Sequence, residues 1–250
     1  MNYTTIDLNA DLGETEGDYL ALLPLITSAN VACGGHAGGG ELLAKTVSAA
    51  LEAKVQVGAH PSYPDRENFG RISMKDSLSR EKLIETIFNQ ISSVKSELEK
   101  HGASLSHIKA HGALYNDAMV DTEVAETLLQ ACVLAAKNVP LFGLPGSKLE
   151  QVCKEHGVEY IAEGFMDRAY NDDGTLVSRT LPNSVLNHAE ATQQAEELIR
   201  SGSITSYQGK PLALIIQTLC VHADTPDAAQ TVIEVRELLE SHQVEISKFR

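Results

Sequence analysis

Short apolar runs alternate with longer segments of helical periodicity along most of the chain. The clearest helical pattern covers residues 83–98, and another covers 226–241. Repeated strand–helix–strand units predict a parallel sheet with right-handed crossovers. The apolar runs expected to form its strands are 4–10, 26–33, 55–60, 107–112, 140–146, 159–165 and 212–220, with 244–249 as a candidate eighth.

An open doubly wound sheet and a closed (β/α) barrel both fit this alternation. The fingerprint G-x-G-x-x-G, which would favour an open dinucleotide-binding sheet, is missing after the first strand, where the chain reads DLNADLGETEGD (7–18). We therefore expect a barrel of seven or eight strands. No linker-like segment divides the chain, so residues 1–250 are interpreted as a single barrel domain. The long loops 61–78 and 166–187 are expected to be functional insertions.

Charge and cysteine content narrow the class of protein. The sequence has 20 Lys and Arg against 34 Asp and Glu, a formal net charge of −14, which argues against nucleic acid or an anionic membrane as the main partner. The chain begins without a signal-peptide pattern, and no apolar run approaches the roughly 20 residues of a membrane span. Its four cysteines form no C-x-x-C motif and suit reduced thiols, so we expect a cytoplasmic protein.

Polar residues gather where the expected strands end. Four of the nine histidines end or closely follow such a run, and acids, an amide and an arginine stand at similar positions. In parallel α/β folds the carboxyl ends of all strands meet on one face, and that face carries the active site. We therefore predict an enzyme with these side chains at one mouth. The residues are Asn9, Asp11, Glu14, His36, His60, His111, Asp167, Arg168 and His222.

Several of these residues also have a purely structural interpretation. A single histidine at a strand end is often an ordinary hydrogen-bonding residue, and Asp11 and Glu14 could cap helices. Asp167 and Arg168 could form a structural ion pair. Lys109 lies inside an apolar run, either as an inward-facing functional cation or as an edge residue. Because burying an unpaired ammonium is costly, we favour the inward cation.

The glycine-rich stretch NVACGGHAGGG (30–40) raises the question of a phosphate-binding loop. A P-loop requires Lys and then a hydroxyl residue after its last glycine, but Gly40 and Glu41 stand there. The stretch is therefore interpreted as a loop that carries His36 to the mouth, ahead of a helix. The chain also lacks the G-x-S-x-G motif of a serine nucleophile.

A metal site is the other interpretation of these residues. One candidate is zinc, held by Cys33 and His36 with Cys220 and His222. The spacing of these residues matches no established zinc motif. A divalent metal held by Asp11, His36 and His111 is the better candidate, and such an ion would activate water for attack on a carbonyl.

Six strand-end segments together resemble one known family. They read DLNADLGE (7–14), ANVACGGHAG (29–38), GAHPSYPDRENFGR (58–71), KAHGALYN (109–116), EGFMDRAYNDDGTLVSR (163–179) and CVHADTPDA (220–228). In this order, and over almost the whole chain, they are similar to the motifs of the LamB/YcsF family. The resemblance implies a distorted TIM-like (β/α) barrel of about seven strands, related to glycoside hydrolase and deacetylase barrels.

The resemblance also implies an activity. Members of this family act with partner subunits B and C in the ATP-dependent 5-oxoprolinase complex, which cleaves 5-oxo-L-proline to L-glutamate while ATP is hydrolysed to ADP and phosphate. ATP would be a co-substrate, bound by this chain or by the partners. Two alternatives stay open: a stand-alone metal-dependent amide hydrolase or deacetylase, and a non-catalytic binding subunit of the complex.

On this hypothesis the polar residues divide into two groups. Water activation and proton transfer are expected from Asp11, His36, His60 and His111. Substrate binding is expected from Asn9, Glu14, Lys109, Tyr115, Asn116, Asp167, Arg168 and His222. Among these, Arg168 and Lys109 are the expected anion binders, since a guanidinium can grip a carboxylate with two parallel hydrogen bonds.

The glycine-rich loop departs from the family pattern, which usually reads A-C-G-F-H-A-G-D-P. Gly35 replaces the aromatic residue, Gly39 the acid and Gly40 the proline. Elsewhere Ala110 replaces a proline and Ala223 a glycine. We expect the loop to be a flexible wall of the site, and the place where rate or specificity differs.

Overall fold

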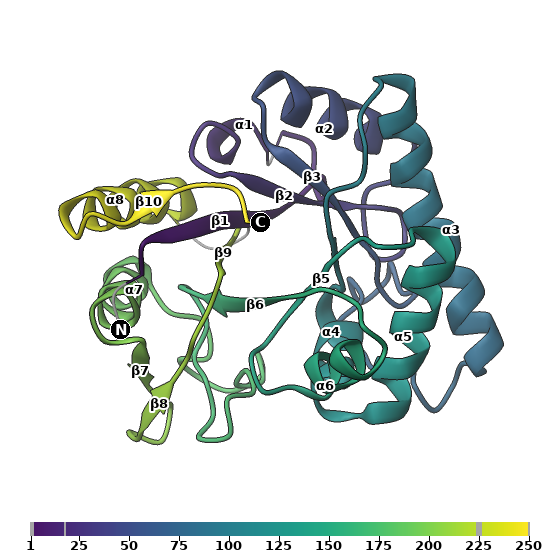
Figure 1. Cartoon of the computed structure of the whole chain (residues 1–250). Coiled ribbons are helices and arrows are strands. Elements are labelled where there is room, and N and C mark those ends of the chain that lie inside the picture. Colours follow the sequence, from purple (N-terminus) through teal and green to yellow (C-terminus); the bar gives the residue numbers. More distant parts are fainter. Residues whose placement is uncertain (1–2, 18, 224–226, 250) are drawn as a thin grey trace.

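The computed structural model describes residues 3–17, 19–223 and 227–249, and within them seven strands close into a parallel barrel (Figure 1). Neighbours pair in the order β1-β2-β3-β4-β5-β6-β9, and β9 pairs with β1 to complete the ring. The predicted barrel is confirmed. Its strands are β1 (Thr5–Leu12), β2 (Ser28–Ala32), β3 (Gln56–His60), β4 (Ile108–Lys109), β5 (Leu141–Gly143), β6 (Tyr160–Phe165) and β9 (Thr218–His222).

Helices surround the ring of strands (Figure 1). The longest, α3, buries Leu83, Ile87, Ile91 and Val94, which recur every three or four residues and so form one apolar face. No helix of the described residues is long and apolar enough to cross a membrane. The helices are α1 (Tyr19–Leu22), α2 (Gly40–Glu52), α3 (Arg80–Lys100), α4 (Gly112–Val120), α5 (Thr122–Ala135), α6 (Lys148–Glu155), α7 (His188–Ser201) and α8 (Ala228–Ser241).

Both helices singled out from the sequence are present. The predicted helix over 83–98 lies inside α3, whose first turn is capped by Ser79, because the hydroxyl accepts a hydrogen bond from the amide of Lys82. The predicted helix over 226–241 is confirmed from Ala228 onward as α8, and residues 224–226 lie outside the described part of the chain.

The apolar run 212–220 does not form the single strand predicted for it. Its first part belongs to β8 (Pro211–Ala213), which pairs antiparallel with β7 (Ser203–Thr205) in a separate hairpin, and its last part begins β9. An unbroken apolar run does not reveal such a division, because both parts are apolar and pack on different partners. The candidate eighth run contains β10 (Glu245–Ile246), which pairs with the first residues of β1 outside the closed ring.

Strand β1 shows how the barrel separates apolar from polar side chains. The even-numbered residues from Ile6 to Leu12 are apolar members of the hydrophobic core. The odd-numbered residues Asp7, Asn9 and Asp11 are also buried, and they reach polar partners on other strands. Since successive side chains of a strand point to opposite faces, the polar set faces the barrel interior. The interior therefore holds polar side chains up to the carboxyl ends of the strands.

Candidate active site

Asn9 connects the barrel strands from within. Its amide nitrogen donates hydrogen bonds to Glu163 Oε1 (3.0 Å) and Thr218 Oγ1 (2.7 Å), and its oxygen accepts one from Asn30 Nδ2 (2.8 Å). Asn30 also donates to Asp11 Oδ1 at 2.8 Å. Asn9 is fully buried behind the cavity surface. It helps to fix the positions of Glu163 and Lys109, the charged groups beside it.

Lys109 is a buried cation in the barrel interior. Its Nζ lies 2.9 Å from Asp11 Oδ1, 2.9 Å from Glu163 Oε1 and 3.0 Å from Cys220 Sγ. Burial disfavours the ammonium, but Asp11, Cys220 and Glu163 outweigh it and raise the pKa of Lys109 well above its usual value. The ammonium is therefore retained, and the predicted inward orientation of Lys109 is confirmed.

Asp11 is the carboxylate that joins Lys109 to the mouth. Its Oδ1 binds Lys109, and its Oδ2 lies 3.3 Å from His60 Nε2. Burial raises the pKa of this carboxyl, but the charges of His60 and Lys109 prevail and hold it well below its usual range. Asp11 is therefore ionised at neutral pH and available as a hydrogen-bond acceptor.

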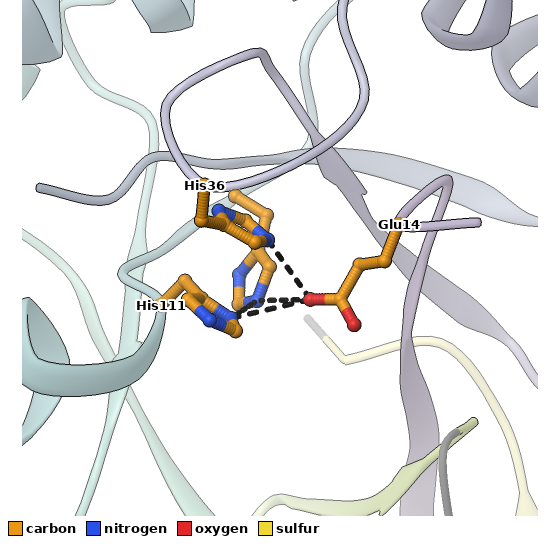
Figure 2. Close-up of side chains that lie close together, drawn as sticks. Glu14, His36 and His111 are labelled. Carbon is orange, nitrogen blue, oxygen red and sulfur yellow. Dashed lines mark hydrogen bonds and ion pairs between the residues drawn. The ribbon is translucent and has the colours of Figure 1, made fainter. Parts of the chain in front are cut away.

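Glu14, His36, His60 and His111, here called the mouth cluster, converge from the ends of the first four barrel strands. Glu14 Oε1 lies 2.9 Å from His36 Nε2, 3.2 Å from His111 Nδ1 and 3.9 Å from His60 Nε2. Figure 2 shows His36 and His111 turned toward the same carboxylate oxygen of Glu14. His60 Nε2 and His111 Nδ1 are 3.0 Å apart. The predicted convergence of these side chains is therefore present.

Backbone carbonyls fix the orientation of two rings in the mouth cluster. His60 Nδ1 donates to the carbonyl oxygen of Lys109 (2.8 Å), and His111 Nε2 donates to that of Phe69 (2.9 Å). Phe69 has a φ of 56°, which is uncommon for a residue other than glycine. The long loop 61–78 thus reaches the site through a backbone carbonyl, which supports its interpretation as a functional insertion.

The protonation of the mouth cluster follows from its burial. Burial lowers the pKa of His36 to about 4 and also lowers that of His111, although Glu14 opposes both shifts. For Glu14, burial acts to raise the pKa, but the contacts of its carboxylate with His111 and His36 hold the pKa below its usual value. An ionised carboxylate therefore faces neutral imidazoles of His36 and His111 near pH 7. Within the described residues, His36 Nδ1 is buried and has no hydrogen-bond partner.

A second acid–histidine pair stands at the end of β9. The carboxylate of Asp167 accepts a hydrogen bond from the amide of His222 (2.9 Å) and lies 3.0 Å from its Nδ1. Because a carboxylate can only accept, Nδ1 carries a proton, and Nε2 is left to exchange protons with a ligand. His222 Nε2 lies 3.8 Å from Asp11 Oδ2.

A cavity of about 700 Å³ opens over these groups and has the size of a small-molecule site. Nine of the twelve predicted site residues line it: Asp11, Glu14, His60, Lys109, His111, Tyr115, Asn116, Arg168 and His222. The other three, Asn9, His36 and Asp167, are buried and contact residues of the lining. The structure thus brings all twelve to one region, as a lining and a layer that supports it.

Arg168 lines the cavity and also supports the loop that follows it. Its Nε donates to the carbonyl oxygen of Ser184 (3.3 Å), and its Nη2 donates to that of Val177 (2.7 Å). These contacts hold the loop 166–187 against the mouth. Anion binding by this guanidinium stays a prediction.

Three charged residues of the site stand outside the twelve predicted from sequence. Glu163, with an exposed fraction of 0%, pairs with Lys109 and accepts a hydrogen bond from Tyr115 Oη (3.1 Å). A carboxylate inside an apolar strand was the available signal, the same one that identified Lys109. Arg71 and Arg179 line the cavity from the two long loops. Loop arginines have no strand register to place them, so only their loops could be singled out.

The structure also separates the candidate metal ligands. The ligand atoms of Glu14 and the three histidines of the mouth cluster all lie within 4.8 Å of one another. Asp11 belongs to a different group, with Cys220 and His222. The set predicted from sequence, Asp11 with His36 and His111, therefore combines members of two groups.

The glycine-rich loop is closely packed at Gly35. A Cβ atom there would lie 2.4 Å from Gln90 Oε1 and 2.4 Å from Ser62 Oγ. Gln90 occupies this space and bonds the backbone of Ser62 through both ends of its amide, at 3.0 and 2.8 Å. The missing side chain at Gly35 thus makes room for a side chain of α3 behind the mouth.

Comparison with known proteins decides the family. The sequence profile of the LamB/YcsF family matches residues 6–250. The chain belongs to the LamB/YcsF family. This LamB/YcsF chain is 38% identical over 247 residues to a protein of Natranaerobius thermophilus named as the A subunit of 5-oxoprolinase, with 96% of the chain and 95% of the relative covered. That name describes one component of an enzyme built from several subunits.

Solved structures agree with the LamB/YcsF assignment. The crystal structure of a lactam utilization protein from Thermus thermophilus is 35% identical, with a TM-score of 0.88 over 98% of this chain and 100% of that one. A family 4 carbohydrate esterase from Streptomyces lividans is only 9% identical, with a TM-score of 0.51 over 99% of this chain and 94% of that one. The second likeness shows the fold alone, which is the barrel expected from the sequence.

Proposed function

We propose that this chain is the A subunit of an ATP-dependent 5-oxoprolinase. With partner subunits B and C it would convert 5-oxo-L-proline to L-glutamate while ATP is cleaved to ADP and phosphate. The observation that carries the proposal is the full-length similarity to a protein of that name, and the acid–histidine mouth of the barrel is consistent with it. A cytoplasmic location belongs to the same proposal, because all four cysteines are free thiols.

The reaction sets definite demands on the site. A lactam is a stable amide, and transfer of a phosphoryl group from ATP to its oxygen makes the ring carbon far more electrophilic. Water then adds to this carbon and the carbon–nitrogen bond breaks, which leaves an acyl phosphate. A second water molecule attacks the same carbon and supplies the second carboxylate oxygen, and phosphate leaves with the former amide oxygen. The site must therefore deprotonate water, supply a proton to the ring nitrogen and compensate anionic groups.

Asp11 is our candidate for the deprotonation of water, and it lies beside the mouth histidines. It is ionised, lines the cavity and lies 3.3 Å from His60 Nε2. Lys109 and Asn30 hold its other oxygen at 2.9 and 2.8 Å, so that one oxygen is fixed while Oδ2 faces the histidines. A fixed carboxylate of this kind needs little reorganisation during the reaction.

His222 is the candidate proton donor to the ring nitrogen. Asp167 fixes its Nδ1–H tautomer and the orientation of the ring, as the acid of a catalytic triad does for its histidine. The Nε2 atom is thereby turned toward the side of the cavity where Asp11 lies, 3.8 Å away. Arg71 and Arg179 supply positive charge at the cavity wall for a carboxylate or phosphate.

A stand-alone metal-dependent amide hydrolase is the second candidate, because the mouth cluster groups four metal-ligand side chains. The two candidates differ in their need for ATP. The hydrolase would release product without ATP and would lose its activity with a chelator. The 5-oxoprolinase would depend on ATP and on both partner subunits.

The test is reconstitution. This chain is mixed with subunits B and C, ATP and 5-oxo-L-proline, and glutamate and ADP are measured together. We expect both products in equal amounts, and neither glutamate nor its coupled ADP when this chain is omitted. Glutamate formation without this chain, or no glutamate with all three chains present, would contradict the proposal.

A further inference from the structure

We propose that the mouth cluster, Glu14, His36, His60 and His111, is a binding site for one divalent transition-metal ion, and that Zn²⁺ fits it best. The proposal differs from the set predicted from sequence, which placed Asp11 where the structure places Glu14 and His60. It concerns an ion held by this chain alone, without ATP, substrate or partner subunits.

The spacing of the donor atoms has the size of a tetrahedral coordination shell. With metal–nitrogen and metal–oxygen bonds of about 2.0–2.1 Å, neighbouring ligands of a tetrahedral zinc ion lie ~3.3 Å apart. The separations from Glu14 Oε1 to the three imidazole nitrogens are 2.9, 3.2 and 3.9 Å, and His60 Nε2 lies 3.0 Å from His111 Nδ1. These distances bracket the tetrahedral value, and all four donor atoms lie within 4.8 Å of one another, so one ion can reach them once the His36 ring reorients.

The hydrogen bonds of His60 and His111 point to a cation between them. A carbonyl oxygen can only accept, so each ring must place its proton on the nitrogen that faces its carbonyl, Nδ1 of His60 and Nε2 of His111. With no second proton on either ring, the two inner nitrogens direct lone pairs at each other across 3.0 Å. A metal ion between them turns this repulsion into two coordinate bonds.

The same carbonyls act as supports of the kind that metal-binding histidines usually have. A histidine ligand almost always donates its outer N–H to a carboxylate, a backbone carbonyl or water, which fixes the ring. Lys109 and Phe69 provide such carbonyls for His60 and His111. His36 has no such carbonyl among the described residues and lies parallel to His111, with ring centroids 3.6 Å apart, so its ring must tilt out of this stack for Nε2 to point at the same ion.

The neighbouring group of Asp11, Cys220 and His222 does not compete for the ion. The Lys109 ammonium already lies 2.9 Å from Asp11 Oδ1 and 3.0 Å from Cys220 Sγ. A second cation there would meet this positive charge at short range. We therefore assign one ion to each chain, at the mouth cluster.

The donor chemistry selects the class of metal. Three imidazole nitrogens and one carboxylate oxygen suit zinc and its neighbours in the first transition row. Calcium and magnesium prefer shells made of oxygen atoms. Because Glu14, His60 and His111 line the cavity, an ion bound to them would be within reach of small molecules.

The experiment uses the full chain after treatment with a chelator. Zinc sulfate is titrated into the protein in competition with a chromophoric chelator, and cobalt(II) is added in a parallel sample as a spectroscopic probe. We expect one zinc per chain and the visible absorption bands of four-coordinate cobalt. His60→Gln and His111→Gln should each weaken zinc binding by about 100-fold or more. His222→Gln, the matched control from the neighbouring group, should keep the stoichiometry and the affinity.

Two results would overturn the proposal. One is wild-type protein that takes up no stoichiometric zinc and gives no four-coordinate cobalt spectrum, a test that no variant's folding can disturb. The other is equal zinc affinity in His222→Gln and in folded His60→Gln, with folding checked by circular dichroism. Neither result bears on glutamate release by the reconstituted complex, so the metal site and the proposed function stand or fall separately.

Discussion

Two levels of the barrel interior bury polar side chains in different ways. At the lower level, near the start of the strands, Asp7 accepts hydrogen bonds from Thr27 (2.7 Å), Ser28 (2.7 Å) and Thr218 (2.5 Å). His107, at the same level, donates from Nε2 to Asn30 Oδ1 (2.6 Å). These groups find their partners inside the protein, as buried polar atoms generally do.

The mouth has polar residues of the same types, but not all of their buried polar atoms find a hydrogen-bond partner among the described residues. The inner nitrogens of His60 and His111 face each other, and His36 Nδ1 is buried without a hydrogen-bond partner in the described part of the chain. A stable fold has no need of such an arrangement, since an incompletely satisfied buried polar network is costly. The comparison teaches that burial and polarity alone do not mark a functional group. The mouth differs because its groups surround a space that a ligand can fill.

The largest expected effect is a loss of stability on substitution of Lys109, which lies between the two levels. Lys109→Met leaves Asp11 and Glu163 buried without their cation, and breaking a buried ion pair from one side typically costs about 3–5 kcal/mol. Urea unfolding should show this loss in the free energy of unfolding. The control, Lys45→Met, removes an exposed ion pair and should change stability little. Equal stability of the two variants would show that the charges of the interior do not act as a connected structural network.

A smaller effect, on activity, is expected from Asp167. In the reconstituted complex, Asp167→Asn should lower kcat for glutamate release by about 100-fold while KM changes little, because His222 loses the carboxylate that fixes its Nδ1–H tautomer and orients Nε2. Asp172→Asn removes an exposed acid of the same loop, which pairs with Lys210, and should leave both quantities unchanged. Wild-type kcat in Asp167→Asn would remove His222 from the proton-transfer step.

The smallest effect is a pH dependence of stability that belongs to the lower level. Burial lowers the pKa of His107 to about 3, against about 6.5 in an unfolded chain. The unfolded state therefore binds a proton that the folded state refuses, and stability is lost as the pH falls below 6.5. Between pH 6.5 and 5 this residue should cost about 2 kcal/mol, a slope missing in His107→Asn. The measurement is urea unfolding of both proteins across this range, and parallel curves would contradict the assignment.

The sequence predicted the fold correctly wherever its pattern of apolar and polar residues fitted only one kind of secondary structure. Alternation of apolar runs with amphipathic helices predicted the barrel, and the apolar face of α3 could be followed residue by residue. The division of 212–220 between two sheets was not predictable, because an apolar strand in the ring and one in the hairpin look the same. The ring is closed by contacts between β9 and β1, which are far apart in the sequence.

The candidate site was predictable in its location and less so in its connections. Strand ends placed His60, His111 and His222 at one mouth, and a lysine in an apolar run indicated an inward charge. The partners of these groups depend on register and loop paths that a linear pattern does not contain. Glu163 beside Lys109, and the carbonyl of Phe69 beside His111, are of this kind. The division of possible metal ligands into two groups has the same origin.

The central claim is that the mouth of the barrel carries the chemistry of lactam cleavage, and two matched histidine variants test it most directly. His222 and His188 each lie 3.0 Å from a carboxylate, but His222 stands at the mouth and His188 pairs with Glu234 on the outer helices. Glutamate release from 5-oxo-L-proline and ATP is measured in complexes reconstituted with His222→Asn or His188→Asn. The account predicts a loss of about 100-fold or more for His222→Asn and near wild-type turnover for His188→Asn. Wild-type turnover in folded His222→Asn would contradict it.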